Sequence, residues 1–435
     1  MRLKRITSAV ALSLAAASLA GCGGGDEGSG SGDDVTLTYW ASNQGTSLEN
    51  DMEVLQPQLD AFTEETGIEV DVEVVPWSDL LNRILAATAS GEGPDVLNIG
   101  NTWSASLQAT GALKQFDDAT MEQIGGADRF LSGSLSATGA EGQPPTAVPL
   151  YSLAYGLYYN KAMFAEAGIT EPPATWAQFV EDAKKLTTGD RWGVSIEGGS
   201  VSENIHNVFT FSEQQGGSFF DEDGEPTFDT PENVAAIKQY VDLIQTDEVA
   251  NPSNAEYSNG TEALADFANG KSAMVMWQAA AGSLAELGMA AEDIGVAPVP
   301  VLDPLPAGGE DVTSIVAGIN LAVFENTEHE EEALQFVEFM TSTDTQIALN
   351  KTYGSLPSVE DAYTDPAFQT EAVETFKDVL SNRAAPMPAV PEESQFETLI
   401  GTAVKNMLAE AASGTTVTED AISEQLAAAQ QQLGG

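Results

Sequence analysis

Apolar and polar residues follow two different periods along the chain. The short segment from Val35 to Trp40 predicts a strand. The next apolar residues recur every three or four positions, which predicts one buried face of a helix, at Leu48, Met52, Leu55, Leu59 and Phe62. Gly67 is placed to end this helix. Pro57 lies inside it and predicts a kink or a later start.

The segments that follow predict a β-α-β-α-β order. Apolar residues at 68, 70, 72 and 74 alternate with acidic residues, which is the period of a strand. A helical stretch from about Asp79 to Ala89 precedes the apolar run from Pro94 to Gly100, which predicts a buried strand. Strands that alternate with helices in this way are typically parallel and joined by right-handed crossovers.

Long helices and short apolar strands continue to alternate up to the C-terminus. Capping boxes predict two helix starts, at Thr175 with Gln178 and at Thr327 with Glu330. Thr230-Pro231 predicts another start, because proline is favoured at the first helical position. Further segments predict three buried strands and a last helix, at Gly156 to Tyr159, Ser272 to Trp277, Ile294 to Val299 and after Thr418. The pattern is that of an α/β protein without internal repeats.

The first 22 residues have the order of a secretory signal peptide. Basic residues precede an uncharged run, which ends at Leu19-Ala20-Gly21-Cys22. The run is shorter than the ~20 apolar residues that cross a bilayer, so a transmembrane anchor is the weaker interpretation. Residues 19–22 resemble the bacterial lipobox, in which the cysteine is lipidated and becomes the first residue of the mature protein. The alternative is cleavage by ordinary signal peptidase, with Cys22 incidental.

Only one cysteine occurs in the chain, so no intramolecular disulfide can form. Residues 23–34 are rich in Gly, Ser and Asp and predict a flexible linker that spans roughly 20 Å. The remaining chain is long enough for two or three domains.

The formal net charge of −51 excludes some partners. Nucleic acid and anionic membrane surfaces are poor partners for so acidic a chain. One hypothesis is adaptation to a saline exterior, because at ~1 M salt the screening length falls to ~3 Å and the acidic groups repel one another less. Capture of cations is the competing explanation. A melting temperature that stays constant up to about 1 M salt would contradict salt adaptation.

Eight segments, in order, resemble one family: the family 1 extracellular solute-binding proteins of sugar ABC transporters. The resemblance covers essentially all of residues 35–435. Its segments run from Phe62 to Val74, Gly91 to Leu97, Pro149 to Trp176, Gly216 to Gly224, Phe267 to Trp277, Ala317 to Val323, Ala333 to Met340 and Tyr353 to Pro357.

The resemblance implies an α/β fold of the type II periplasmic-binding kind. Two lobes, each a mostly parallel sheet flanked by helices, would close on a ligand. Lobe one would hold residues 35–146 and 316–357, and lobe two residues 147–315 and 358–435. The family also implies a monomer without a cofactor that meets the transmembrane subunits of an ABC permease. The lipidated Cys22 would anchor it to the outer face of the cell membrane.

The six tryptophans fall into two groups according to their position relative to the predicted strand ends. In open α/β sheets, ligands bind beyond the carboxyl ends of strands. Trp77, Trp176 and Trp192 lie at predicted helix starts or turns, whereas three others lie at or just after predicted strand ends: Trp40, Trp103 and Trp277. An indole stacks well on the C–H face of a sugar, so these three are ligand candidates. The alternative for each is a place in the core.

Polar residues near the same strand ends complete the candidate site: Asn43, Asn101, Tyr151 and Asn320. The resemblance implies sugar contacts at Asn101 and Trp103 and a close backbone approach at Gly318. It also implies an arginine near the ligand at Arg383, for which the alternative is a surface arginine. The acidic contact that some family members use early in the chain has no clear counterpart at Ser42-Asn43-Gln44.

Enzyme motifs are incomplete, and no catalytic residue or metal site is predicted. Gly270-Lys271-Ser272 ends like a phosphate loop, but Ala265 stands where that loop needs glycine. His206 and His329 are the only histidines, too few for a histidine-rich metal site.

The sequence therefore predicts the sugar-binding lipoprotein of an ABC importer. The alternatives are a binder of polyamines or other small cationic solutes, a secreted glycoside hydrolase, whose carboxylate pair stays possible, and a surface adhesin.

Overall fold

The computed structural model describes residues 35–140, 142–221, 224–258, 261–278 and 280–434. The predicted signal peptide, Cys22 and the linker lie outside these residues. Residues 35–435 form one compact unit. Within the described part of the chain, no helix has both the length and the apolar character needed to cross a membrane.

The first half of the chain builds most of a six-stranded sheet. Its order is β11-β4-β10-β3-β1-β2. The strands are β1 (Thr36–Ser42), β2 (Glu69–Val75), β3 (Val96–Gly100), β4 (Val148–Leu153), β10 (Ala317–Val323) and β11 (Leu356–Pro357). β1 pairs with β2 and with β3 in parallel, which confirms the predicted β-α-β-α-β order.

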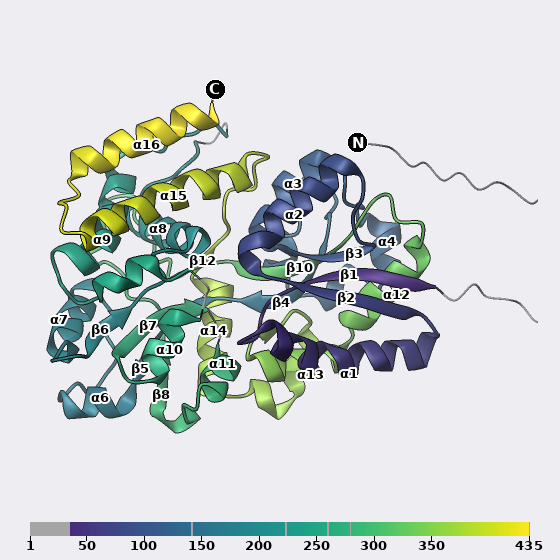
Figure 1. The fold of residues 1–435 in the computed structure, drawn as a ribbon, viewed down its shortest axis with the longest axis horizontal. Coiled ribbons are helices and arrows are strands. Elements are labelled where there is room, and N and C mark those ends of the chain that lie inside the picture. The colour runs from purple at the N-terminus through teal and green to yellow at the C-terminus, as the bar shows by residue number, and fades with distance from the viewer. Residues whose placement is uncertain (1–34, 141, 222–223, 259–260, 279, 435) are drawn as a thin grey trace, which may run out of the picture. The chain divides into compact units, whose positions relative to one another are not determined.

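Helices cover both faces of this sheet (Figure 1). One face packs on α1 (Leu48–Thr66), α12 (Glu330–Met340) and α13 (Thr343–Tyr353). The other face packs on α2 (Trp77–Ser90) and α3 (Ser104–Thr110). Ser47 caps α1 and Gly67 ends it at φ 78°, so the predicted end is confirmed. The predicted later start is wrong, because the helix already runs from Leu48 through Pro57.

A four-stranded sheet has the order β6-β7-β5-β8. Its strands are β5 (Tyr155–Asn160), β6 (Trp192–Ser195), β7 (Ser272–Gln278) and β8 (Ile294–Ala297). Trp192 therefore begins a strand, not a turn. β6 and β7 are parallel, whereas β5 is antiparallel to β7 and β8.

Most strands of each sheet point the same way, as predicted: β1, β2, β3 and β4 in the six-stranded sheet, and β6, β7 and β8 in the four-stranded sheet. In the six-stranded sheet, β10 is antiparallel to β3 and β4, and β11 is antiparallel to β4. The chain path explains why β10 runs the opposite way. The chain leaves this sheet at the end of β4, passing through Ala154 directly into β5 of the other sheet, and no crossover helix returns it in parallel. The chain leaves the six-stranded sheet after Leu153 rather than after residue 146; the two lobe ranges remain a prediction.

Five helices of at least eleven residues share one core with the four-stranded sheet. They are α7 (Trp176–Leu186), α8 (Val201–Gln215), α9 (Pro231–Gln245), α15 (Glu393–Ala412) and α16 (Glu419–Leu433). Another core contains residues of α10 (Glu262–Ala268), α11 (Ala281–Glu286) and α14 (Glu371–Asn382). Shorter elements are α4 (Asp118–Gln123), α5 (Ser132–Ser136), α6 (Lys161–Glu166) and the paired strands β9 (Ser314–Ile315) and β12 (Ala384–Ala385).

Two of the three predicted helix starts are confirmed. Thr175 and Gln178 form a capping box at α7, and the side chain of Thr230 caps α9. The capping box at Thr327 is wrong, because α12 begins at Glu330 after His329. The Thr327 hydroxyl instead donates to Asp95 at 2.5 Å, so a long-range contact takes the place of the local cap.

Candidate ligand-binding site

Two neighbouring parallel strands bring Glu197 and Trp277 to one edge of the four-stranded sheet. Glu197 follows β6 after one residue, and Trp277 is the last but one residue of β7. The carboxyl ends of parallel strands meet at the same edge, where open α/β sheets bind ligands. The two residues line a narrow buried space together with Ile196, Glu203, Asn207, Tyr240 and Met276. We refer to this space as the cavity. Each lining residue is at most 9% exposed.

The sequence after β6 fixes where the two carboxylates lie. A Cβ on Gly199 would stand 2.7 Å from the Tyr257 carbonyl oxygen, so only glycine lets the chain turn here. Ser200 then caps α8, its side chain accepting from the Glu203 backbone N–H at 3.3 Å. Glu203 therefore stands in the first helical turn, where the helix dipole favours negative charge.

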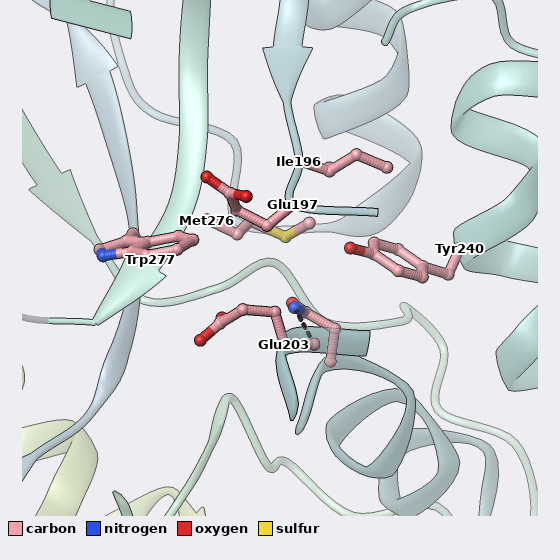
Figure 2. A pocket seen from close by; sticks show the side chains of 7 residues that line it. Ile196, Glu197, Glu203, Tyr240, Met276 and Trp277 are labelled. Carbon is pink, nitrogen blue, oxygen red and sulfur yellow. Dashed lines mark hydrogen bonds between the residues drawn. The ribbon is translucent and has the colours of Figure 1, made fainter. Parts of the chain in front are cut away.

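Figure 2 shows how the cavity side chains are oriented. The carboxyl groups of Glu197 and Glu203 both extend toward the side on which the Trp277 indole lies. The Tyr240 hydroxyl points inward from the opposite side. The aromatic ring of Trp277 and two carboxyl groups therefore line one buried space.

A hydrogen-bonded network leads away from Glu203. The Tyr155 hydroxyl donates to Glu203 Oε2 at 2.8 Å and lies 2.9 Å from His206 Nδ1. Gln278 Nε2 donates to the same hydroxyl at 2.9 Å, because Tyr155 and Gln278 are register partners on β5 and β7.

The network continues to a tryptophan from the six-stranded side. His206 Nε2 lies 3.3 Å from Glu397 Oε1, and the Trp103 indole N–H donates to Glu397 Oε2 at 3.0 Å. Trp103 also stacks on Trp77, with ring centroids 4.5 Å apart. We call Tyr155, Glu203, His206, Glu397 and Trp103 the buried acidic network.

Burial and neighbouring charges shift the pKa values in this region. Burial raises the pKa of Glu197 to about 7 and also raises that of Glu203. Burial opposes charge on His206 and on Glu397 too, but their mutual hydrogen bond and attraction outweigh it. The pKa of His206 is therefore raised and that of Glu397 lowered, which describes an imidazolium–carboxylate pair.

Residues 45–347 match the family of bacterial extracellular solute-binding proteins. The chain belongs to this family.

Relatives of this solute-binding protein bind several saccharides. The arabinooligosaccharide-binding protein of Halalkalibacterium halodurans is 26% identical over 80% of this chain and 77% of its own. The diacetylchitobiose binding protein DasA of Streptomyces coelicolor is 24% identical over 82% of each chain. The structure of maltose-bound MalE3 of T. maritima has a TM-score of 0.78 and 26% identity, and the match covers 92% of this chain and all of that one.

Two predicted ligand residues of this solute-binding protein are linked through the network. Trp277 lines the cavity, and Trp103 reaches it through Glu397, His206 and Tyr155. Asn101 lies beside Trp103 in a 3-10 turn, Asn101–Trp103, but its amide donates to the Val316 carbonyl at 2.7 Å.

Other predicted polar residues are engaged within the six-stranded side. Asn43 donates to Asp51 Oδ2 at 2.8 Å. The Asn320 amide donates to Ser104 Oγ and to the Ala137 carbonyl, both at 3.0 Å. Tyr151 is 2% exposed and belongs to the core of the six-stranded sheet.

Gly318, Trp40 and Arg383 also have protein partners. A Cβ on Gly318 would stand 2.7 Å from the Tyr151 carbonyl, so the close approach here is to β4. The Arg83 guanidinium lies 4.0 Å above the Trp40 ring centroid. Arg383 forms an ion pair with Asp311. The structure does not bring these three residues to the cavity lining.

Sequence reasoning missed the acidic part of the site. Glu197 carries one usable signal: it is the first charged residue after an apolar strand and precedes a glycine pair and a helix cap. Glu203, His206 and Glu397 lie on helices that mostly face a core, and no local pattern marks them. Among the described residues, no group of three or more His, Cys, Asp or Glu has an arrangement suited to a metal ion.

Proposed function

We propose that this protein captures a mono- or oligosaccharide and delivers it to the permease subunits of an ABC importer. The observation that carries the proposal is the cavity at the strand ends, where Trp277 stands with Glu197 and Glu203. The relatives that bind arabinooligosaccharide, diacetylchitobiose and maltose support a saccharide as the ligand class.

The chemistry of the cavity suits a sugar. The indole of Trp277 offers an apolar face for the C–H face of a pyranose ring. The carboxylates of Glu197 and Glu203 accept hydrogen bonds from hydroxyl groups, and charged acceptors make the stronger bonds. The Tyr240 hydroxyl adds a donor.

Contacts between the two sheet regions support a closing motion. Thr46 and Asn50, at the start of α1, donate to the Glu286 carboxylate of α11 at 2.6 and 2.9 Å. Together with the bond from Trp103 to Glu397, they join segments that belong to different predicted lobes. A ligand that prefers the closed arrangement would shift the equilibrium toward it and present the closed surface to the permease.

Ligand binding is tested by thermal denaturation of the purified protein against a saccharide panel. At least one saccharide should raise the melting temperature, because a ligand at 1,000 times its Kd adds about 4 kcal/mol of stability. Small-angle scattering with that saccharide should show compaction. Failure of every saccharide to stabilise the protein would refute the proposal. Release of product from chromogenic glycosides would instead reveal a hydrolase.

The anchor is a separate part of the proposal. We expect the chain to be cut before Cys22, lipidated there and held as a monomer on the outer face of the cell membrane. Mass spectrometry of the mature N-terminal peptide should show a diacylglyceryl mass on Cys22. Cys22→Ser should move the protein from the membrane fraction to the medium, and unchanged membrane retention would contradict the anchor.

A further inference from the structure

The cavity that receives the proposed sugar is negatively charged, with no opposing cation in its lining. None of its seven lining residues is Lys or Arg. His206 is the basic group nearest in the network, and it already contacts Tyr155 and Glu397. His206 offsets part of the charge of Glu203, whereas no Lys, Arg or His in the lining faces Glu197.

One carboxylate oxygen in the cavity has no hydrogen bond. Glu197 Oε1 accepts from the Ala263 backbone N–H at 2.9 Å. Glu197 Oε2 is buried and has no hydrogen-bond partner, in a residue that is 2% exposed. Buried polar oxygens in native proteins nearly always have a partner, so this one points to a donor supplied by a ligand.

A protonated amine would satisfy this cavity more completely than a hydroxyl group would. A hydroxyl provides one donor but no positive charge, so a buried carboxyl beside it either carries an uncompensated charge, which is costly, or must hold a proton. An ammonium group supplies up to three donors and the missing positive charge. Its attraction to the face of the Trp277 indole adds to this.

We propose that the preferred ligand is a saccharide that carries a protonated amino group, held by Glu197, Glu203 and Trp277. This inference rests on the proposed function. The amine lies between the two carboxylates, and the sugar ring packs on the indole.

Calorimetry on the unmodified protein with matched ligands tests the proposal. The probes are glucosamine and its β-1,4 dimer, the N-acetylated forms of both, glucose and cellobiose, and spermidine as a cation without a sugar ring. The amino sugar should bind at least about tenfold more tightly than its matched neutral forms, as expected for a charge-assisted bond. The preference should persist in ~0.5 M salt, because buried pairs are screened little.

Two variants separate the cavity charge from the acidity of the whole surface. Glu197→Gln keeps an acceptor for the Ala263 N–H and removes the charge, so it should reduce the ratio of amino-sugar affinity to neutral-sugar affinity to less than about threefold. Glu424→Gln, on an exposed position of α16, should leave the preference unchanged.

The outcomes distinguish this inference from the proposed function. Neutral sugars that bind as tightly as their amino forms would overturn the inference and leave sugar capture standing. Spermidine that binds more tightly than every sugar would also overturn it, in favour of a polyamine ligand. Absence of binding by all saccharides would overturn both.

Discussion

The strand ends of the two main sheets use their polar groups differently. At the six-stranded sheet, the amides of Asn43, Asn101 and Asn320 all donate to neighbouring protein groups. At the four-stranded sheet, Glu197 keeps a buried oxygen without a partner beside Trp277. Hydrogen bonds within the protein fix the side chains of the first region, whereas the second region has an acceptor that a ligand could use. Ligand specificity should therefore depend mainly on the four-stranded region.

The largest expected effect is on the four-stranded side, at Trp277. Trp277→Ala should weaken saccharide binding about 100-fold or more, because it removes the stacking face at the centre of the site. Calorimetry with the saccharide selected by the thermal panel measures this effect. Trp277→Phe, which keeps an aromatic ring and is less disruptive to the core, should lose less than about tenfold. Equal affinity in both variants and the unmodified protein would place the ligand elsewhere.

The next effect concerns pH and the unpaired carboxyl. The pKa of Glu197 is raised from 4.5 to about 7 by burial, so its contribution to stability is full below pH 4.5 and is lost as pH rises through 7. The free energy of unfolding without ligand should fall by about 2–3 kcal/mol from this group between pH 4.5 and 8. Urea unfolding of Glu197→Gln should lack this part of the decrease.

Glu424→Gln is the control for the pH effect, because its exposed position on α16 should leave the decrease unchanged. If Glu197→Gln had the same pH dependence as the unmodified protein, the carboxyl would not be held in the buried state that the structure gives it.

A smaller effect should appear on the six-stranded side as a loss of stability. Asn320→Ala removes two hydrogen bonds of a buried amide and should cost about 1–3 kcal/mol of unfolding free energy. Saccharide affinity of the folded variant should stay within about twofold, since the amide is occupied by the protein. A loss of affinity without a loss of stability would reverse the roles of the two regions.

The smallest effect is expected at Arg383. Its ion pair with Asp311 lies near the surface, where such pairs contribute about 0–1 kcal/mol. Arg383→Ala should change the unfolding free energy by less than about 1 kcal/mol and leave saccharide affinity almost unchanged. A tenfold loss of affinity would show that Arg383 contacts the ligand, as the family resemblance implies.

The sequence by itself determined the local elements and one central ligand candidate. The alternating pattern predicted β2, and the helical spacing predicted α1 and α9, because burial of one face imposes that spacing. A continuous apolar run predicted β3, which is buried on both faces. The same reasoning marked Trp277, since the apolar run of β7 makes its carboxyl end visible in the chain. Asn43, Asn101 and Asn320 were also marked, but their spacing holds no information on whether a neighbour already uses their hydrogen bonds.

Only the tertiary structure decided which polar groups meet. Glu197, Glu203, His206 and Glu397 come from segments as much as 200 residues apart, and the packing of α8 and α15 on the four-stranded sheet brings them to Tyr155 and Trp277. The antiparallel return of β10 was likewise decided by the chain path between two sheets. Local patterns report the face that each element buries, whereas the pairing of charges and the strand direction depend on contacts between distant segments.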